Sequence, residues 1–194
     1  MKKKFGVMTA VTAVFFLVGT GMAAAGTLED VIKRDVLRCV VSTGIAGFAY
    51  PDKSGVWKGF DIEFCRATAA AVLGDASKIK AVTSTGKTRF TKLNAGEGDV
   101  LWRNTTITFS RDVGVKLRFH GVNYYDGQGF MVPKKLGVKS AKDLDGASVC
   151  IQTGTTTELN LADYFHGFVG SYFSIIIFVN TVDSLGDDLR VLYM

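Results

Sequence analysis

Three strand-like segments alternate with two helix-like segments between residues 36 and 102, and this order constrains the fold more than any other feature of the sequence. Residues 36–41, 78–83 and 99–102 are predicted to form strands, and residues 60–73 and 88–95 are predicted to form helices, each followed by a glycine. A βαβαβ order predicts a parallel sheet with helices on its faces. We therefore expect an α/β fold.

Polar loops follow two of these strands. The loop after residue 102 carries Asn104, Thr106 and Arg111, and the loop after residue 41 carries Phe48. Ligands of parallel sheets bind beyond the carboxyl ends of the strands, so both loops should face one crevice. An arginine fork beside short hydroxyl and amide groups suits a small carboxylate. The alternative is an ordinary junction in which Asn104 caps a helix, Arg111 is solvated and Phe48 packs locally.

The sequence changes character after residue 114. We predict strands at 115–119 and 147–151, a short helix at 140–144, and a long extended run at 122–132 whose glycines suggest a bend or a crossing between two lobes. Thr155 and Glu158 fit a capping box for a helix that runs to residue 165. Thr156 then lies at a helix N-terminus, where free N–H groups bind anions. A plain helix cap is the alternative.

The first 25 residues have the features of a secretory signal peptide. Three lysines are followed by an apolar run at 7–18 and by three alanines at 23–25. A membrane anchor, the alternative, needs about 20 apolar residues, and this run is shorter. The whole chain carries a formal charge of +5, of which these lysines supply three, so the remainder is too weakly basic to predict a nucleic-acid surface.

The chain has three cysteines, and this odd number is informative in an exported chain, because thiols tend to pair there as disulfides. Cys39 lies in a predicted strand and Cys65 in a helix that could pack on it, so the two could lie within bridging distance. Three buried free thiols are the alternative. The spacing of the cysteines and of the two histidines fits no zinc motif, so we predict no metal site and no cofactor.

Five stretches together resemble one protein family: LRCVVSTG, KGFDIEFCRATAAAVLGD, DVLWRNTT, VNYYDGQGFMV and DLDGASVCIQTGTTTELNLADYF. This family is the periplasmic general L-amino-acid-binding proteins of ABC importers, within the polar amino-acid group of solute-binding proteins. The resemblance covers about residues 27–165. It implies a two-lobed, type II periplasmic-binding-protein-like fold with parallel or mixed sheets. Residues 26–122 would form the first lobe, residues 123–132 the crossing strand or hinge, and residues 133–194 part of the second lobe.

The resemblance also implies a role for each candidate residue. Arg111 would hold the α-carboxylate of the ligand, and Thr106 and Asn104 would bond its carboxylate and ammonium groups. Thr156, next to Thr155 at the start of its helix, would hold the carboxylate from the second lobe. Phe48 would cover the ligand side chain. The lobes would close on an L-amino acid without any catalytic step, and the closed form of this periplasmic monomer would dock on a membrane permease.

The chain departs from the family toward its C-terminus. Family members are longer, and the match fades after residue 165, before the segment that carries the acidic partner of the ligand's ammonium and a partner for Cys150. Residues 172–179 form a β-prone run, and Trp102 stands where a small residue is usual. The resemblance therefore predicts a truncated receptor with impaired binding. The alternatives are a non-functional remnant, an interaction fragment, and an enzyme on the same fold, such as a dehydratase-like domain.

Overall fold

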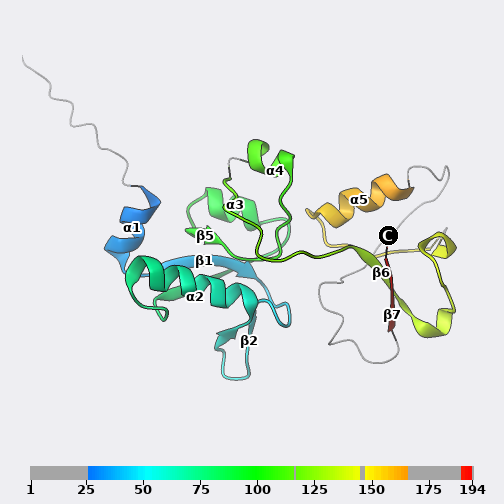
Figure 1. Cartoon of the computed structure of the whole chain (residues 1–194), viewed down its shortest axis with the longest axis horizontal. Coiled ribbons are helices and arrows are strands. Elements are labelled where there is room, and N and C mark those ends of the chain that lie inside the picture. Colours follow the sequence, from blue (N-terminus) through cyan, green and yellow to red (C-terminus); the bar gives the residue numbers. More distant parts are fainter. Residues whose placement is uncertain (1–25, 116, 145–146, 166–188, 194) are drawn as a thin grey trace, which may run out of the picture.

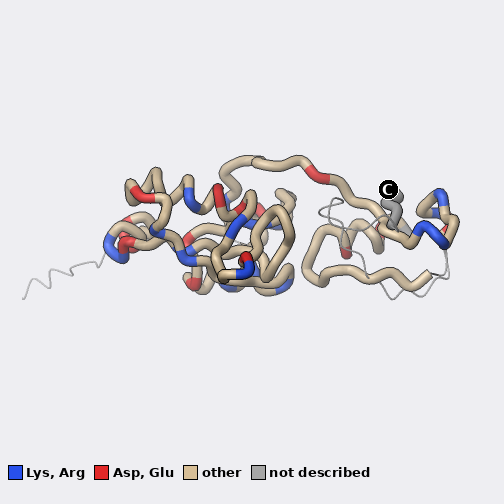
Figure 2. The backbone as a smooth tube through the Cα atoms, turned by 90° about the horizontal axis from the view of Figure 1, so that it is seen from below, with Lys and Arg blue, Asp and Glu red and all other residues tan. Residues whose placement is uncertain are grey.

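The computed structural model describes residues 26–115, 117–144, 147–165 and 189–193, and it places them in two lobes joined by an extended segment (Figure 1). The view turned by 90° shows the same two lobes and the same single crossing (Figure 2). The predicted signal peptide and the β-prone run at 172–179 lie outside the described residues. Within those residues, no helix has the length and apolar character needed to cross a membrane.

The first lobe is built on a three-stranded parallel sheet in the order β4-β1-β5. The strands of this sheet are β1 (Leu37–Ser42), β4 (Ile79–Ser84) and β5 (Val100–Leu101). The helices of the lobe are α1 (Thr27–Arg34), α2 (Phe60–Leu73), α3 (Arg89–Asn94) and α4 (Phe109–Gly114). A small hairpin is formed by β2 (Tyr50–Pro51) and β3 (Trp57–Lys58). The predicted α/β fold with a parallel sheet is confirmed, and the five predicted elements have their observed ends within one residue of the prediction.

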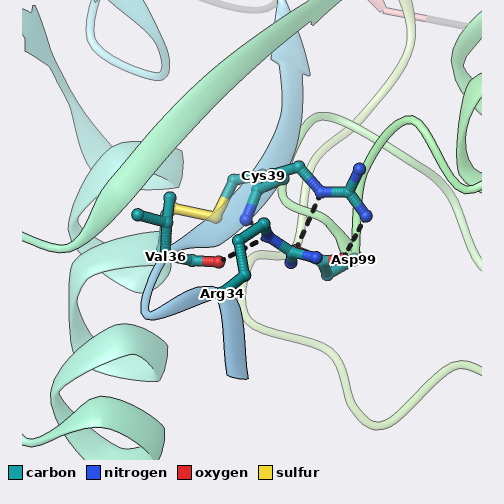
Figure 3. A network of polar contacts seen from close by, with 6 residues as sticks. Arg34, Val36, Cys39 and Asp99 are labelled. Carbon is teal, nitrogen blue, oxygen red and sulfur yellow. Dashed lines mark hydrogen bonds and ion pairs between the residues drawn. A yellow bond between two sulfur atoms is a disulfide. The ribbon is translucent and has the colours of Figure 1, made fainter. Parts of the chain in front are cut away.

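The core of this lobe lies between β1 and α2. β1 is the central strand, so its backbone is paired on both sides, and its apolar residues are buried against Ile62, Cys65 and Ala69 of α2. A disulfide joins Cys39 of β1 to Cys65 of α2, with a Cα–Cα distance of 6.2 Å (Figure 3). The strand and the helix are therefore linked covalently as well as by packing.

The second lobe is described in part. It contains β6 (Gly129–Pro133), which pairs antiparallel with β7 (Leu189–Tyr193), two 3₁₀ turns, η1 (Lys134–Leu136) and η2 (Ala141–Leu144), and the helix α5 (Thr156–Phe165). Its buried apolar side chains are Phe130, Val132, Ala141, Leu144, Val149 and Leu161. This second cluster shares no residue with the core of the first lobe, so each lobe packs around its own centre.

Two strand predictions for this half of the chain are wrong. The described residues of 115–119 form no strand, because Val115 ends α4 and the chain then runs along the crossing without a ladder partner. The run at 122–132 is part of the extended segment between the lobes, and its last part is paired, as β6 (Figure 1). Residues 147–151 form no strand beyond one bridging residue, and the predicted helix at 140–144 is a 3₁₀ turn. A segment with high strand propensity forms a strand only where a neighbouring strand completes its backbone hydrogen bonds.

Candidate functional site

Short side chains tie the carboxyl end of β1 to the end of β4 and to the loop before β2. Ser84 at the end of β4 donates its hydroxyl to the carbonyl of Val41, at 3.0 Å, and Ser42 donates to the carbonyl of Ala49, at 3.1 Å. The loops that follow β4 and β5 lie against the loop before α5 of the second lobe, with Gly86 next to Thr153 and Gly154 next to Lys87. The candidate site is therefore at the contact between the lobes.

Arg111 is held inside this contact by its helix. Thr108 caps α4 and accepts a hydrogen bond from the backbone N–H of Arg111, while the Arg111 guanidinium lies 5.3 Å from the centre of the Phe90 ring. Its Nη1 donates to the carbonyl of Thr106 at 2.9 Å, and its Nη2 reaches the carbonyl of Gly154 in the other lobe at 3.5 Å. The side chain is buried rather than solvated, and burial lowers its pKa.

Thr106 and Thr156 meet across the lobes, with their hydroxyl oxygens 3.1 Å apart. Thr155 is used differently, because its hydroxyl donates to the carbonyl of Gln152 at 2.7 Å and accepts from the backbone N–H of Glu158 at 3.3 Å. The Glu158 carboxylate in turn accepts from the N–H of Gly154 at 2.8 Å. Thr155 and Glu158 thus cap α5, and Thr156 is the hydroxyl that this helix presents to the first lobe.

Two further arginines, which the sequence analysis did not single out, are buried beside these residues. Arg89 is only 1% exposed, and it donates to the carbonyls of Asn104 at 2.9 Å and Gly154 at 3.2 Å. Arg103 is 7% exposed, and its Nε and Nη2 both donate to Oδ1 of Asn104, at 3.2 and 3.1 Å. In the sequence, these two arginines are marked only by lying, like Arg111, near the ends of predicted strands. Arginines at such positions are usually solvated, so the sequence does not indicate their burial.

The charges of these groups affect one another. Burial, together with the charges of Arg103 and Arg111, lowers the pKa of Arg89 to about 9. Burial lowers the pKa of Arg103 to about 10, opposed by the charge of Asp61. Burial raises the pKa of Asp61 itself to about 6, opposed by Arg103. Arg89 and Arg103 are therefore protonated at neutral pH, and none of the three arginines forms an ion pair with a carboxylate in the described ranges.

Phe48 lies in a group of aromatic rings on one side of the site. Its ring is 8% exposed and makes edge contacts with Phe60 of α2 at 5.9 Å and with Tyr124 of the crossing segment at 5.3 Å. Phe64 and Trp102 continue the group, with their rings stacked at 4.9 Å. The structure thus brings Asn104, Thr106, Arg111 and Thr156 to one contact, while Phe48 anchors the crossing segment to the first lobe.

No group of three histidine, cysteine or acidic side chains that could hold a metal ion occurs among the described residues. The donor set of the site consists of guanidinium, hydroxyl and amide groups. The guanidinium groups carry the charge of this set and bind anions, to which the hydroxyl and amide groups can add hydrogen bonds.

Curated proteins similar to this chain bind amino acids, according to their names. The chain is 62% identical over 145 residues to the glutamate/glutamine/aspartate/asparagine-binding protein BztA of Rhodobacter capsulatus, covering 75% of this chain and 43% of that protein. It is 54% identical over 165 residues to the general L-amino acid-binding periplasmic protein AapJ of Rhizobium johnstonii, covering 85% and 48%. The chain therefore spans about half the length of these relatives.

Solved structures share the fold. A periplasmic binding protein of an ABC transporter from Brucella ovis, solved with glutathione bound, has a TM-score of 0.73 and 51% identity, covering 79% of this chain and 48% of that one. An ancestral arginine-binding protein bound to arginine has a TM-score of 0.63 and 27% identity, covering 74% and 61%. The fold is that of the type II periplasmic binding proteins. Residues 37–167 match the family model of these receptors, and the chain belongs to the bacterial extracellular solute-binding proteins, family 3.

Proposed function

We propose that this chain binds the carboxylate of an L-amino acid at the contact between its lobes, as the receptor component of an ABC importer. The observation that carries the proposal is Arg111, a buried cation that has no carboxylate partner among the described residues. A buried, unpaired charge costs several kcal/mol, so a site that keeps one is suited to a ligand that supplies the opposite charge.

The hydrogen bonds of Arg111 support a carboxylate in particular. Its bond to the carbonyl of Gly154 is 3.5 Å long, at the limit of a hydrogen bond, so a carboxylate oxygen would be a better acceptor. The hydroxyls of Thr106 and Thr156 lie at the same contact, one from each lobe, and either can donate to an anion. A ligand held by both hydroxyls would connect the two lobes, which fits closure of one lobe on the other.

The relatives support an amino acid as the source of this carboxylate. BztA is named for glutamate, glutamine, aspartate and asparagine, AapJ for L-amino acids in general, and YhdW of Escherichia coli for an amino-acid ABC transporter. The proposal includes export to the periplasm by residues 1–25, a monomeric state and a membrane permease as partner.

Isothermal titration calorimetry of the purified chain with a panel of L-amino acids, including L-glutamine, L-glutamate and L-arginine, tests the proposal. We expect at least one of them to bind, and Arg111→Ala to lower its affinity by about 100-fold, the effect of about 3 kcal/mol for truncating a buried charged partner. Arg118→Ala is the matched control, because Arg118 is exposed on the crossing segment. A folded chain that binds none of the panel would contradict the proposed function.

A further inference from the structure

Gln128, at the end of the crossing segment, is bonded to the first two turns of α5. Its Nε2 donates to the carbonyl of Thr157 at 3.2 Å, and its Oε1 accepts from Nδ2 of Asn160 at 2.9 Å. A backbone carbonyl only accepts hydrogen bonds, so the NH₂ group of Gln128 must face Thr157 and its carbonyl oxygen must face Asn160. Both ends of the amide are therefore engaged by one helix.

These bonds reach the end of α5 that faces the first lobe. Thr157 directly follows Thr156, whose hydroxyl oxygen lies 3.1 Å from that of Thr106 across the lobes. Farther along the helix, Leu161 is buried in the apolar cluster of the second lobe. The middle of α5 is thus packed into its own lobe, and the bonds from Gln128 determine the direction in which its first turn points.

The crossing segment is held on its other side by the first lobe. Four residues before Gln128, the ring of Tyr124 makes edge contacts with Phe48 at 5.3 Å and with Phe60 at 5.8 Å. Residues 125–127, between these two anchors, are exposed and make no hydrogen bond, ion pair or ring contact in the described part of the chain. A change in the angle between the lobes therefore meets least resistance at these three residues, because it breaks no such contact there.

We propose that Gln128 is a positioning residue for ligand binding, which makes α5 turn together with the end of the crossing segment and so brings Thr156 to the ligand when the lobes close. The inference rests on the proposed function and assigns one residue within it. Gln128 acts through α5, since both ends of its amide bond to that helix. Without these bonds, α5 could rotate about its packed middle, and Thr156 would meet the ligand in only some of its orientations.

The test is Gln128→Met in the full chain, titrated with each L-amino acid of the panel that the unmodified chain binds. Methionine has a similar length and can form neither hydrogen bond. The helix should still form, because the carbonyl of Thr157 keeps its intrahelical bond and the exposed amide of Asn160 can bond to water. We expect the affinity to fall by about tenfold, the effect of losing two neutral hydrogen bonds of modest strength.

A double variant separates positioning of Thr156 from general damage to the second lobe. A residue that acts through the Thr156 hydroxyl loses its effect once that hydroxyl is removed. In a Thr156→Val background, we therefore expect Gln128→Met to lower the affinity by less than about twofold. General damage to the lobe would lower it by the same factor in both backgrounds.

Asn123→Ala is the control, because it removes an amide at an exposed position of the same segment, and it should change the affinity in neither background. The backbone amide resonances of Thr156 and Thr157 give a second readout, since saturating ligand should shift them less in the Gln128→Met chain. An equal loss of affinity in both backgrounds, or no loss in either, would overturn the inference alone. A folded, unmodified chain that binds no amino acid would overturn the proposed function and the inference with it.

Discussion

Asp99, which directly precedes β5, pairs with Arg34 at the end of α1 and with Arg38 in β1, at the end of the sheet opposite the candidate site (Figure 3). Its carboxylate is 3% exposed and accepts from the backbone N–H of Arg38 at 2.7 Å, from the Arg38 guanidinium at 2.8 Å and from Arg34. Burial alone would raise its pKa, but the bonds from Arg38 and the two positive charges outweigh burial and lower it.

A group whose pKa is lowered by folding stabilises the protein above its unfolded pKa, about 3.9 for aspartate, and loses this effect as the pH falls through the folded value. We therefore expect Asp99→Asn to lower the free energy of unfolding by about 1–3 kcal/mol at neutral pH, since both arginines are partly exposed. The difference from the unmodified chain should shrink as the pH falls from neutral to below the unfolded pKa of aspartate. Urea titrations at both pH values measure it, and a difference independent of pH would count against the assignment.

The sequence was least informative at the scale of single residues. Asn104, Thr106, Arg111 and Thr156 could be singled out because they follow predicted strands or start a predicted helix. Arg89 could not, because it begins a helix where a charged residue is commonly solvated, and one of the two carbonyls that accept its hydrogen bonds, that of Gly154, comes from the second lobe. The local sequence cannot encode a burial that another lobe creates.

At the scale of elements, the disulfide is the strongest link between β1 and α2. Cys39 and Cys65 are 26 residues apart and both are buried, so the bond restricts a loop of moderate length in the unfolded chain. Cys39→Ala combined with Cys65→Ala should lower the free energy of unfolding by about 3 kcal/mol. Urea titration under oxidising conditions measures this. Cys150→Ser, which removes the free thiol of the described part, is the control and should have little effect.

The elements of the first lobe and the helix α5 were predictable, and the strands of the second lobe were not. In the first lobe, the hydrophobic period of α2 and the apolar strands agree with the parallel sheet that they build, so local and tertiary preferences coincide. In the second lobe, β6 pairs with β7, about 60 residues away in the sequence. Residues 147–151, although strand-like in sequence, form no strand beyond one bridging residue. Which β-prone segment becomes a strand depends there on a distant partner, and a pattern within ten residues does not specify that partner.

At the scale of the whole molecule, glycines lie at the contact between the two lobes. A Cβ atom on Gly86 would lie 3.0 Å from the carbonyl oxygen of Thr153 and 3.1 Å from the side chain of Gln152, both in the second lobe. Gly86 has no left-handed backbone conformation, so alanine strains only this contact. We expect Gly86→Ala to keep the first lobe folded but to oppose closure, at a cost of about 1–3 kcal/mol.

The proposed function couples closure of the lobes to ligand binding, and under it this cost should appear as a loss of amino-acid affinity of about tenfold or more. Small-angle X-ray scattering at saturating ligand should show a larger radius of gyration than for the unmodified chain. Gly121→Ala is the control, since a Cβ atom there would meet no other atom within 4 Å. If Gly86→Ala bound as tightly as Gly121→Ala at an equal radius of gyration, the liganded protein would not contain this contact. Closure would then depend on the Arg89, Arg111 and Thr156 contacts alone.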